Sequence, residues 1–444
     1  MRRPTIDMSV FKERRQKLAT LTEGAAVVLH AQPEYLRNND VGYPYRQDTN
    51  FFYLTGFEEP ESILVFRAGQ SPETTLFVRA KDVERETWDG FRYGPEATKK
   101  EFKMDDVQLI KDFDRLIPDL LKTVDRVYYP MNQIPEFDIK MREILGQVRM
   151  AQGRAGYGHL AVYDSREVIG ELRIKKSKHD VQTMRRACEL SAQGHIEAMR
   201  ATKPGVNERT LQGLLFASFL RQGAAREGYN SIVGSGNNAT TLHYVFNDQE
   251  CKDGDLVLID AGGEFEYYTG DITRTFPVNG KFTEVQKRVY QGVLDVNKKI
   301  IAMVKPGIAF RALQEATIEM LTDLMLDLKL LSGTRKPLID SLAFKKYYPH
   351  GVSHWLGMDV HDAGLHILRG EPRKLEAGMA FTVEPGLYIP AGDMSAPAEL
   401  RGIGIRIEDN LVVTETGSEN LTLSCPKEIS ELEAIIGKAA TSAH

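Results

Sequence analysis

The sequence predicts an α/β protein of two domains, the second built from two copies of one structural unit. The chain has 444 residues, which at roughly 150 residues per domain suffices for two or three domains. Strand-like and helix-like segments alternate through its first third. Farther along, one helix pattern with the same ending occurs twice, at Lys203-Pro-Gly205 and at Lys305-Pro-Gly307. Self-similarity of this kind indicates a duplicated half-domain.

The N-terminal region contains short segments rich in β-branched and aromatic residues and bounded by glycine, proline or charge, which is typical of strands. They are residues 25–30, 62–66, 74–78 and 126–130. Residues 102–124 and 134–148 mix acids and lysine with leucine and isoleucine, and we expect helices there. Between residues 153 and 178 the pattern weakens. We therefore predict an α/β domain of residues 1–174 and a second domain of residues 175–444.

The predicted duplication rests on two helices that begin and end alike. Each begins at a capping box, Ser177 with Asp180 and Thr283 with Gln286. Each continues with apolar residues three or four positions apart, which marks one buried face. Each stops at Lys-Pro-Gly, where proline and glycine end a helix.

Composition excludes several classes of protein. Lys and Arg number 57 and Asp and Glu 62, and the net charge of −5 argues against binding to nucleic acid. No apolar run reaches the roughly 18 residues of a membrane helix. The first residues lack the apolar core of a signal peptide, so a cytoplasmic location is expected. Three distant cysteines exclude a disulfide framework and a cysteine zinc site.

Acidic residues occur on strands that are otherwise apolar. Asp260 ends the run Leu256-Val-Leu-Ile, and Glu384 ends Met379-Ala-Phe-Thr-Val. Asp271 shares a strand face with Thr273 and Thr275, and Glu408 shares one with Arg406. Asp260 taken alone could simply cap a turn. A carboxylate is nevertheless costly to bury without a partner, and converging carboxylates repel one another unless a cation lies between them.

Histidines cluster close to these acids in the sequence. Four of the ten lie between positions 350 and 366: His350, His354, His361 and His366. Carboxylates with an imidazole suit Mn, Co or Zn. Four carboxylates are too many for one catalytic zinc but are natural for two ions that share bridging ligands.

The spacing of Asp260, Asp271, His354, Glu384 and Glu408 resembles the ligand set of the pita-bread metallopeptidases, which include methionine aminopeptidases, prolidases and aminopeptidase P. Residues 43–56, 348–362 and 401–409 resemble bacterial aminopeptidase P in particular. The resemblance implies an α+β pita-bread catalytic domain with pseudo-twofold duplicated halves, placed after the N-terminal α/β domain. It also implies a two-metal exopeptidase that hydrolyses the N-terminal Xaa-Pro bond of peptides through a metal-bridging hydroxide.

The same resemblance implies a role for each site residue. Asp260 would chelate one ion, His354 and Glu384 the other, and Asp271 and Glu408 would bridge. Glu384 would also accept and return a proton. The remaining residues would contact substrate: His243 and His361 beside the scissile carbonyl, His350 and Arg406 around the proline, and Tyr229, Tyr388 and Asp40 elsewhere. Trp88 is similar in position to a tryptophan that a neighbouring subunit contributes in bacterial relatives, although its neighbours match less closely.

The cofactors expected from the resemblance are two divalent ions, chiefly Mn²⁺, with Co²⁺ or Zn²⁺ as alternatives. The expected partners are peptides with proline at position two and further copies of the chain in a homodimer or homotetramer, with neither nucleic acid nor membrane. Two alternative functions remain open at this point. One is a prolidase that cleaves only Xaa-Pro dipeptides, and the other is a non-catalytic binding member of the same fold.

Overall fold

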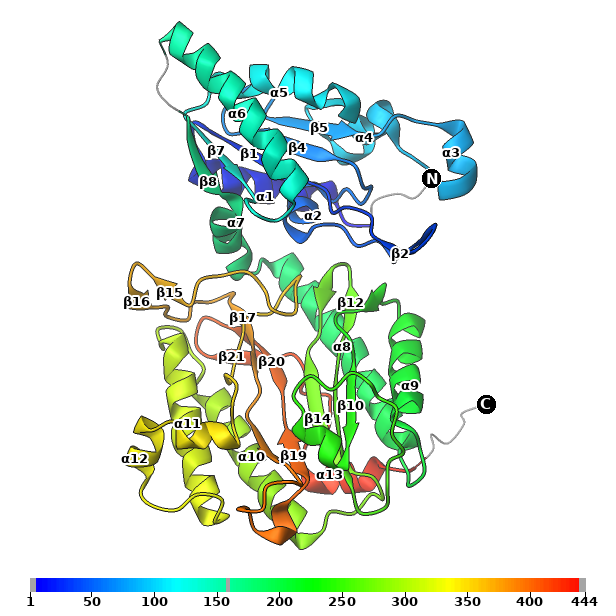
Figure 1. Cartoon of the computed structure of the whole chain (residues 1–444), viewed down its shortest axis with the longest axis vertical. Helices are drawn as coiled ribbons and strands as arrows, with labels where there is room; N and C mark the ends of the chain where they lie inside the picture. Colours follow the sequence, from blue (N-terminus) through cyan, green and yellow to red (C-terminus); the bar gives the residue numbers. More distant parts are fainter. Residues whose placement is uncertain (1–4, 157–159, 439–444) are drawn as a thin grey trace. The chain divides into compact units, whose positions relative to one another are not determined.

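The computed structural model describes residues 5–156 and 160–438. The chain divides into two compact units, residues 1–172 and residues 173–444 (Figure 1). The division falls inside helix α7 (Ser165–Ile174). Among the described residues, no helix has both the length and the apolar character needed to cross a membrane.

Unit 1 contains a six-stranded mixed sheet in the order β6-β5-β4-β1-β7-β8. Its central strand β1 is buried along its whole length and pairs antiparallel with β4 and parallel with β7. Apolar side chains of α5 and α6 pack together on the sheet. The strands are β1 (Ala25–His30), β4 (Ile63–Arg67), β5 (Thr74–Val78), β6 (Asp106–Leu109), β7 (Arg126–Tyr129) and β8 (Ala161–Asp164), with a small hairpin of β2 (Leu36–Asn38) and β3 (Val41–Gly42). The helices are α1 (Met8–Leu21), α2 (Thr49–Thr55), α3 (Val83–Asp89), α4 (Gly94–Phe102), α5 (Phe113–Leu121) and α6 (Pro135–Ala155).

The four strands predicted in this unit are confirmed as β1, β4, β5 and β7, but the helix predicted over residues 102–124 is wrong in part. The segment forms strand β6 before helix α5 begins. The cause is a long-range contact: the Asp105 carboxylate accepts hydrogen bonds from the backbone N–H (2.9 Å) and hydroxyl (3.0 Å) of Thr74. These bonds align β6 parallel to β5, and edge pairing overrides local helix propensity.

The described part of unit 2 contains five antiparallel sheets flanked by long helices. Three of them, β10-β11-β14, β17-β20-β21 and β18-β19, surround the site described below, and the other two are β13-β12-β9 and β15-β16. The strands of the first three sheets are β10 (Ile232–Ser235), β11 (Leu256–Ala261), β14 (Ile272–Pro277), β17 (Ala380–Val383), β18 (Gly386–Ile389), β19 (Ile403–Arg406), β20 (Asp409–Val413) and β21 (Ser418–Asn420). The minor strands are β9 (Arg226–Glu227), β12 (Gly263–Phe265), β13 (Tyr268–Thr269), β15 (Ile367–Leu368) and β16 (Glu371–Pro372). The helices are α8 (Lys178–Ala201), α9 (Glu208–Arg221), α10 (Glu284–Met303), α11 (Phe310–Asp327), α12 (Arg335–Asp340) and α13 (Ile429–Ile435).

The two halves of unit 2 repeat one arrangement, as the sequence predicts. Helices α8 and α10 both begin at the predicted capping boxes. After each helix a glycine, Gly205 or Gly307, adopts a positive φ of 86° or 87°, which an L side chain rarely tolerates. In the first half α8 packs against α9 and beside β14; in the second, α10 packs against α11 and beside β17 (Figure 1).

Candidate metal centre

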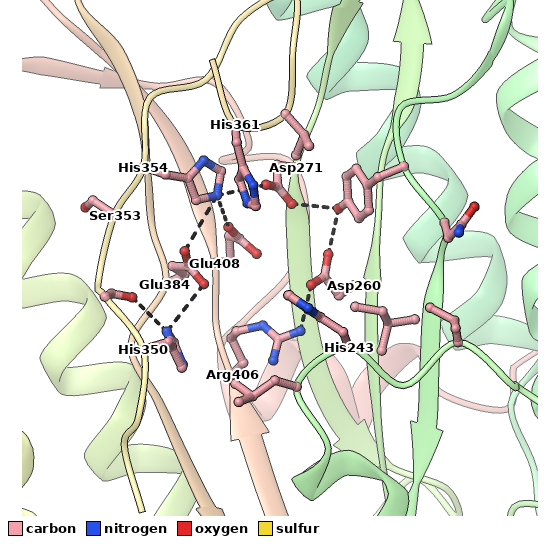
Figure 2. Close-up of a pocket in the computed structure, with 17 residues that line it drawn as sticks. His243, Asp260, Asp271, His350, Ser353, His354, His361, Glu384, Arg406 and Glu408 are labelled. Carbon is pink, nitrogen blue, oxygen red and sulfur yellow. Dashed lines mark hydrogen bonds and ion pairs between the residues drawn. The ribbon is translucent and has the colours of Figure 1, made fainter. Parts of the chain in front are cut away.

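Four carboxylates reach one cavity from paired strands of the two halves (Figure 2). Asp260 lies on β11, and Asp271 directly precedes β14; the two strands pair antiparallel. Glu384 directly follows β17, and Glu408 directly precedes β20, which is the partner of β17. Each half therefore contributes two acids from neighbouring strands.

The cavity has a volume of about 550 Å³ and is lined by most of the predicted site residues. They are Tyr229, His243, Asp260, Asp271, His350, His354, His361, Glu384, Arg406 and Glu408. Its apolar wall comes from Ile232, Leu242, Val245 and Val360. A cavity that combines apolar walls with a few convergent polar groups is typical of a small-molecule or peptide-end site.

His354 stands at the centre of the carboxylates. Its Nε2 atom lies 3.3 Å from Asp271 Oδ2, 3.6 Å from Glu384 Oε1 and 4.0 Å from Glu408 Oε1. Burial by itself would lower the pKa of His354, but the hydrogen bond to Asp271 and the charges of Glu384 and Asp271 raise it to about 9. The imidazole ring thus occupies a strongly negative environment.

The two glutamates of the cluster have raised pKa values. Burial raises the pKa of Glu408 well above its ordinary value, and the charges of Asp271, Glu384 and Asp260 add to this effect. Burial likewise raises the pKa of Glu384 to about 7. One ligand atom each from Asp271, His354 and Glu408 lies within 4.8 Å of the others. This donor set fits divalent cations, since positive charge at its centre would relieve the repulsion.

Asp260 has two protein partners at the edge of the cluster. Arg406 Nη2 donates to Asp260 Oδ2 at 2.6 Å, and the Tyr229 hydroxyl lies 2.6 Å from both Asp260 Oδ1 and Asp271 Oδ1. A hydroxyl has only one proton, so Tyr229 donates to one of these carboxylates at a time. Burial and the neighbouring Asp260 and Asp271 raise the pKa of Tyr229 well above its usual value, which keeps its proton in place.

A second histidine connects the cluster to a tyrosine outside the cavity lining. His350 Nε2 lies 2.7 Å from the Tyr388 hydroxyl, and Arg406 Nη1 donates to the same hydroxyl at 3.1 Å. Burial and the charge of Arg406 lower the pKa of His350 to about 4, so this ring is neutral at pH 7. The ring of His361 lies 4.4 Å from that of His354, edge to face.

Comparison with known proteins agrees with this geometry. Residues 182–415 match the model of metallopeptidase family M24, and residues 11–128 match that of the aminopeptidase P N-terminal domain. The chain is 40% identical to the Xaa-Pro aminopeptidase of Escherichia coli over 97% of this chain and 98% of that protein. It is 35% identical to human Xaa-Pro aminopeptidase 3, covering 98% and 87% of the two chains.

Solved structures agree equally well. The aminopeptidase PepP of Pseudomonas aeruginosa superimposes with a TM-score of 0.93 at 42% identity and covers 98% of both chains. A zinc-substituted E. coli aminopeptidase P in complex with product gives a TM-score of 0.92 at 39% identity, covering 98% and 100%. The chain belongs to metallopeptidase family M24, in its aminopeptidase P group.

This membership confirms the predicted family, the predicted two-part fold with a pita-bread domain, and the predicted class, a divalent-metal hydrolase. The number and identity of the ions and the role of each residue stay predictions. Asp40 lies exposed in unit 1, in the turn between β2 and β3, and Trp88 of α3 is 85% exposed; neither is among the residues that line the cavity.

Two polar residues that support the cluster were not predicted as site residues. The Thr273 hydroxyl donates to Glu408 Oε2 at 2.6 Å. The Asn410 side chain accepts from the backbone N–H of Asp271 at 2.8 Å and donates to the carbonyl of the same residue. Thr273 could have been found from its place on the same strand face as Asp271. Asn410 carries no such signal, because its contact joins residues far apart in the sequence.

Proposed function

We propose that this chain removes the N-terminal residue from peptides whose second residue is proline. The observation that carries the proposal is the cluster of four carboxylates and His354 on the wall of one cavity that also has apolar walls, in a chain of the aminopeptidase P group. An Xaa-Pro bond is a tertiary amide without an N–H group, so a peptidase cannot grip it through that donor. Recognition must come from groups that contact the carbonyl and the ring.

The metal site of this proposal holds two divalent ions, with Mn²⁺ as the expected metal and Co²⁺ or Zn²⁺ as alternatives. Asp260, Asp271, His354, Glu384 and Glu408 would hold them. Bound divalent ions supply Lewis acidity and lower the pKa of water. Glu384 would accept the proton of the attacking water and return it; its carboxylate lies 3.7 Å from His350 Nδ1 and 3.6 Å from His354 Nε2.

Other cavity residues would handle the substrate. His243 and His361 line the cavity beside the cluster, where they can donate to the oxygen of the scissile carbonyl and stabilise its developing charge. His350 and Arg406 line the cavity and would receive the proline ring, and the Tyr388 hydroxyl behind them is hydrogen-bonded to both. Tyr229 would fix Asp260 and Asp271, and Asp40 is retained as a weaker candidate for contact with substrate.

A panel of synthetic peptides tests the proposed activity. Purified protein is incubated with Xaa-Pro-Yaa-Zaa, the matched Xaa-Ala-Yaa-Zaa and the dipeptide Xaa-Pro, each with Mn²⁺ and with chelator, and products are measured by mass spectrometry. We expect release of the first residue from the proline peptide alone, abolished by chelator. Cleavage of only the dipeptide would make the protein a prolidase. No cleavage together with no bound metal would indicate a binding protein.

We further propose a domain boundary near residue 174, assembly as a homodimer or homotetramer, and action in the cytoplasm. Exposed apolar side chains in unit 1, including Leu36 (70%) and Trp88 (85%), support a contact between copies. Cys188, Cys251 and Cys425 are free and buried, in keeping with a reducing compartment. Sedimentation of the purified protein measures the assembly.

A further inference from the structure

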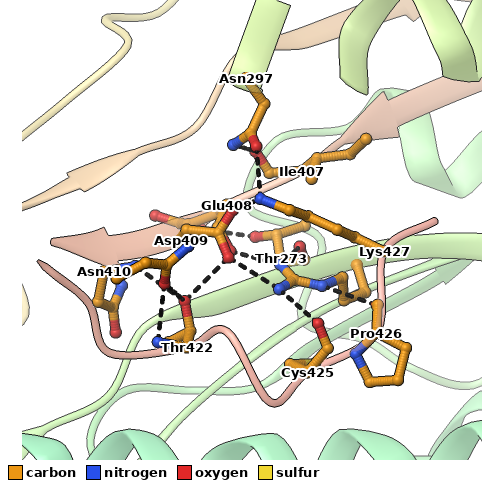
Figure 3. Close-up of polar contacts among 12 residues, drawn as sticks. Thr273, Asn297, Ile407, Glu408, Asp409, Asn410, Thr422, Cys425, Pro426 and Lys427 are labelled. Atoms are coloured by element: carbon orange, nitrogen blue, oxygen red, sulfur yellow. Dashed lines mark hydrogen bonds and ion pairs between the residues drawn. The ribbon is translucent and has the colours of Figure 1, made fainter. Parts of the chain in front are cut away.

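A second cluster of buried polar side chains lies on the opposite face of the strands that carry the carboxylates (Figure 3). Thr273 and Glu408 point to the cavity side, where their side chains are hydrogen-bonded to each other. The next residues in the chain, Arg274 and Asp409, point the other way, since successive residues of a strand face opposite sides. Both are fully buried and form an ion pair at 2.9 Å.

Asn297 of helix α10 joins the two strands that deliver the glutamates. Its Nδ2 atom donates to the backbone carbonyls of Val383 and Ile407, both at 3.2 Å. These carbonyls belong to the residues directly before Glu384 and Glu408. One fully buried amide group therefore sets the distance between the backbone positions from which both glutamates extend.

Lys427 fixes the orientation of that amide. Its Nζ atom donates to Asn297 Oδ1 at 2.8 Å and to Asp409 Oδ2 at 2.6 Å. An ammonium group only donates hydrogen bonds, and a backbone carbonyl only accepts them. The Asn297 side chain can satisfy both kinds of neighbour in one orientation only, with its oxygen toward Lys427 and its NH₂ toward the two carbonyls.

Arg274 completes the connection to Glu408. Its Nη1 atom donates to the carbonyls of Glu408 (2.5 Å) and Thr273 (3.0 Å). Its Nε and Nη2 atoms donate to the carbonyls of Pro426 and Cys425, both at 3.0 Å, on the segment that carries Lys427. The backbone of Glu408 is thus held from behind while its carboxylate is held in front by Thr273.

We propose that Asn297 and Lys427 are positioning residues that set the separation of Glu384 and Glu408 and thereby the affinity of the protein for divalent ions. Neither residue is among those that line the cavity, so they act through the two glutamates. The inference rests on the metal ligands of the proposed function. It follows from the small tolerance of metal–ligand distances, about 0.2 Å, which a shift of either ligand strand would exceed.

The test uses the full-length protein, stripped of metal by chelator, and Mn²⁺ alone as the probe. Isothermal titration measures Mn²⁺ affinity of the wild type, Asn297→Ala and Lys427→Met, and circular dichroism shows whether each variant is folded. We expect both variants to bind Mn²⁺ about 10- to 100-fold more weakly, the usual effect of losing a residue that orients metal ligands. With excess Mn²⁺, turnover should recover while KM for an Xaa-Pro peptide stays unchanged.

Gln152 in unit 1 provides the matched control. It too is a buried amide that donates to two backbone carbonyls, those of Lys122 (3.3 Å) and Val124 (2.9 Å), but it belongs to the unit without the carboxylate cluster. Gln152→Ala should lower thermal stability and leave Mn²⁺ affinity unchanged. A purely structural role for Asn297 predicts the same behaviour in Asn297→Ala.

The outcomes separate this inference from the metal assignment. Folded variants that bind Mn²⁺ as tightly as the wild type, whatever their stability, would overturn the positioning role and leave the proposed function intact. A wild type that binds no Mn²⁺ would overturn both. If Asn297→Ala does not fold, Lys427→Met decides the question, because its ammonium lies at the partly exposed edge of the cluster.

Discussion

Glu408 and Asp409 are consecutive residues, both almost fully buried, and their electrostatic environments are opposite. For Glu408, burial and the surrounding carboxylates raise the pKa. For Asp409, burial opposes ionisation, but Arg274 and Lys427 outweigh it and lower the pKa far below the usual range. The side chains of Arg274 and Lys427 both contact the Asp409 carboxylate. Among the described residues, the Glu408 carboxylate has no cation of the protein at that distance. A carboxylate paired inside the protein stabilises the fold, and one left unpaired at a cavity is suited to a cation from solution.

Asp362 belongs with Asp409 in this comparison. It follows the cavity residue His361 in the chain, its side chain is 1% exposed, and its partners are Lys176, at 2.9 Å, and Arg173. Burial alone would raise its pKa, yet these two cations lower it. Asp362 and Asp409 thus have lowered pKa values, whereas the pKa values of the cavity acids Glu384 and Glu408 are raised, as is that of Asp260 despite its ion pair with Arg406.

The largest expected effect is the loss of turnover after substitution of a carboxylate in the cavity. Asp271→Asn should lower turnover by about 10³-fold or more, because the stabilisation that bound ions give a transition state amounts to several kcal/mol. The metal-free variant should be about as stable as the metal-free wild type, because the change removes both repulsion from the other carboxylates and attraction to His354. Peptide cleavage and urea unfolding of the stripped proteins measure the two effects. Near-normal turnover would contradict the assignment of Asp271 as a metal ligand.

Substitution of an acid that is paired inside the protein should instead lower the free energy of unfolding. Asp409→Asn leaves Arg274 and Lys427 without their shared counter-charge and should lower the free energy of unfolding by about 3–5 kcal/mol, the usual effect of breaking a buried pair. Urea unfolding at pH 7 measures the loss. Glu284→Gln is the control, because Glu284 is 90% exposed in its pair with Lys287. That change should stay within about 0.5 kcal/mol. Equal effects of both changes would remove the distinction between buried and surface pairs.

A cavity residue that is not a predicted ligand should show a smaller effect. His361→Ala should reduce turnover by about 10²-fold, as expected for loss of one group that stabilises an oxyanion. Metal content, measured by mass spectrometry after dialysis against Mn²⁺, should match the wild type. Loss of metal from this variant would place His361 among the ligands.

The smallest effect concerns pH and Asp362. Because its folded-state pKa is depressed, its ion pairs stabilise the protein fully above the unfolded-state value of about 3.9 and progressively less as pH falls through the folded value. The difference in unfolding free energy between wild type and Asp362→Asn should be constant from pH 7 to about pH 5. Below about pH 4 it should shrink, by about 1.4 kcal/mol for each unit of pKa depression. Urea unfolding over this range measures it, and a difference that persists undiminished in acid would show that Asp362 acts through packing.

Much of the fold and of the cluster could be predicted from local patterns. Capping boxes, Lys-Pro-Gly helix ends and acids on apolar strands are set by residues within a few positions of one another, and they appear where expected. Strand β6 could not be predicted, because its residues pair with those of β5, 31 positions earlier in the chain. The positioning role of Asn297 could not be predicted either, since the sequence does not show which backbone carbonyls a buried asparagine of a helix will contact.

The sequence by itself determined which residue types could form the site and on which strand faces they lie, because backbone periodicity is a local property. Only the tertiary structure decided which acids would be neutralised by the protein and which would be left for a cation. Glu408 and Asp409 cannot be told apart in this respect from the chain around them. Their difference depends on Arg274, 135 positions from Asp409 in sequence, and on the strand pairing that brings its guanidinium to one face and not the other.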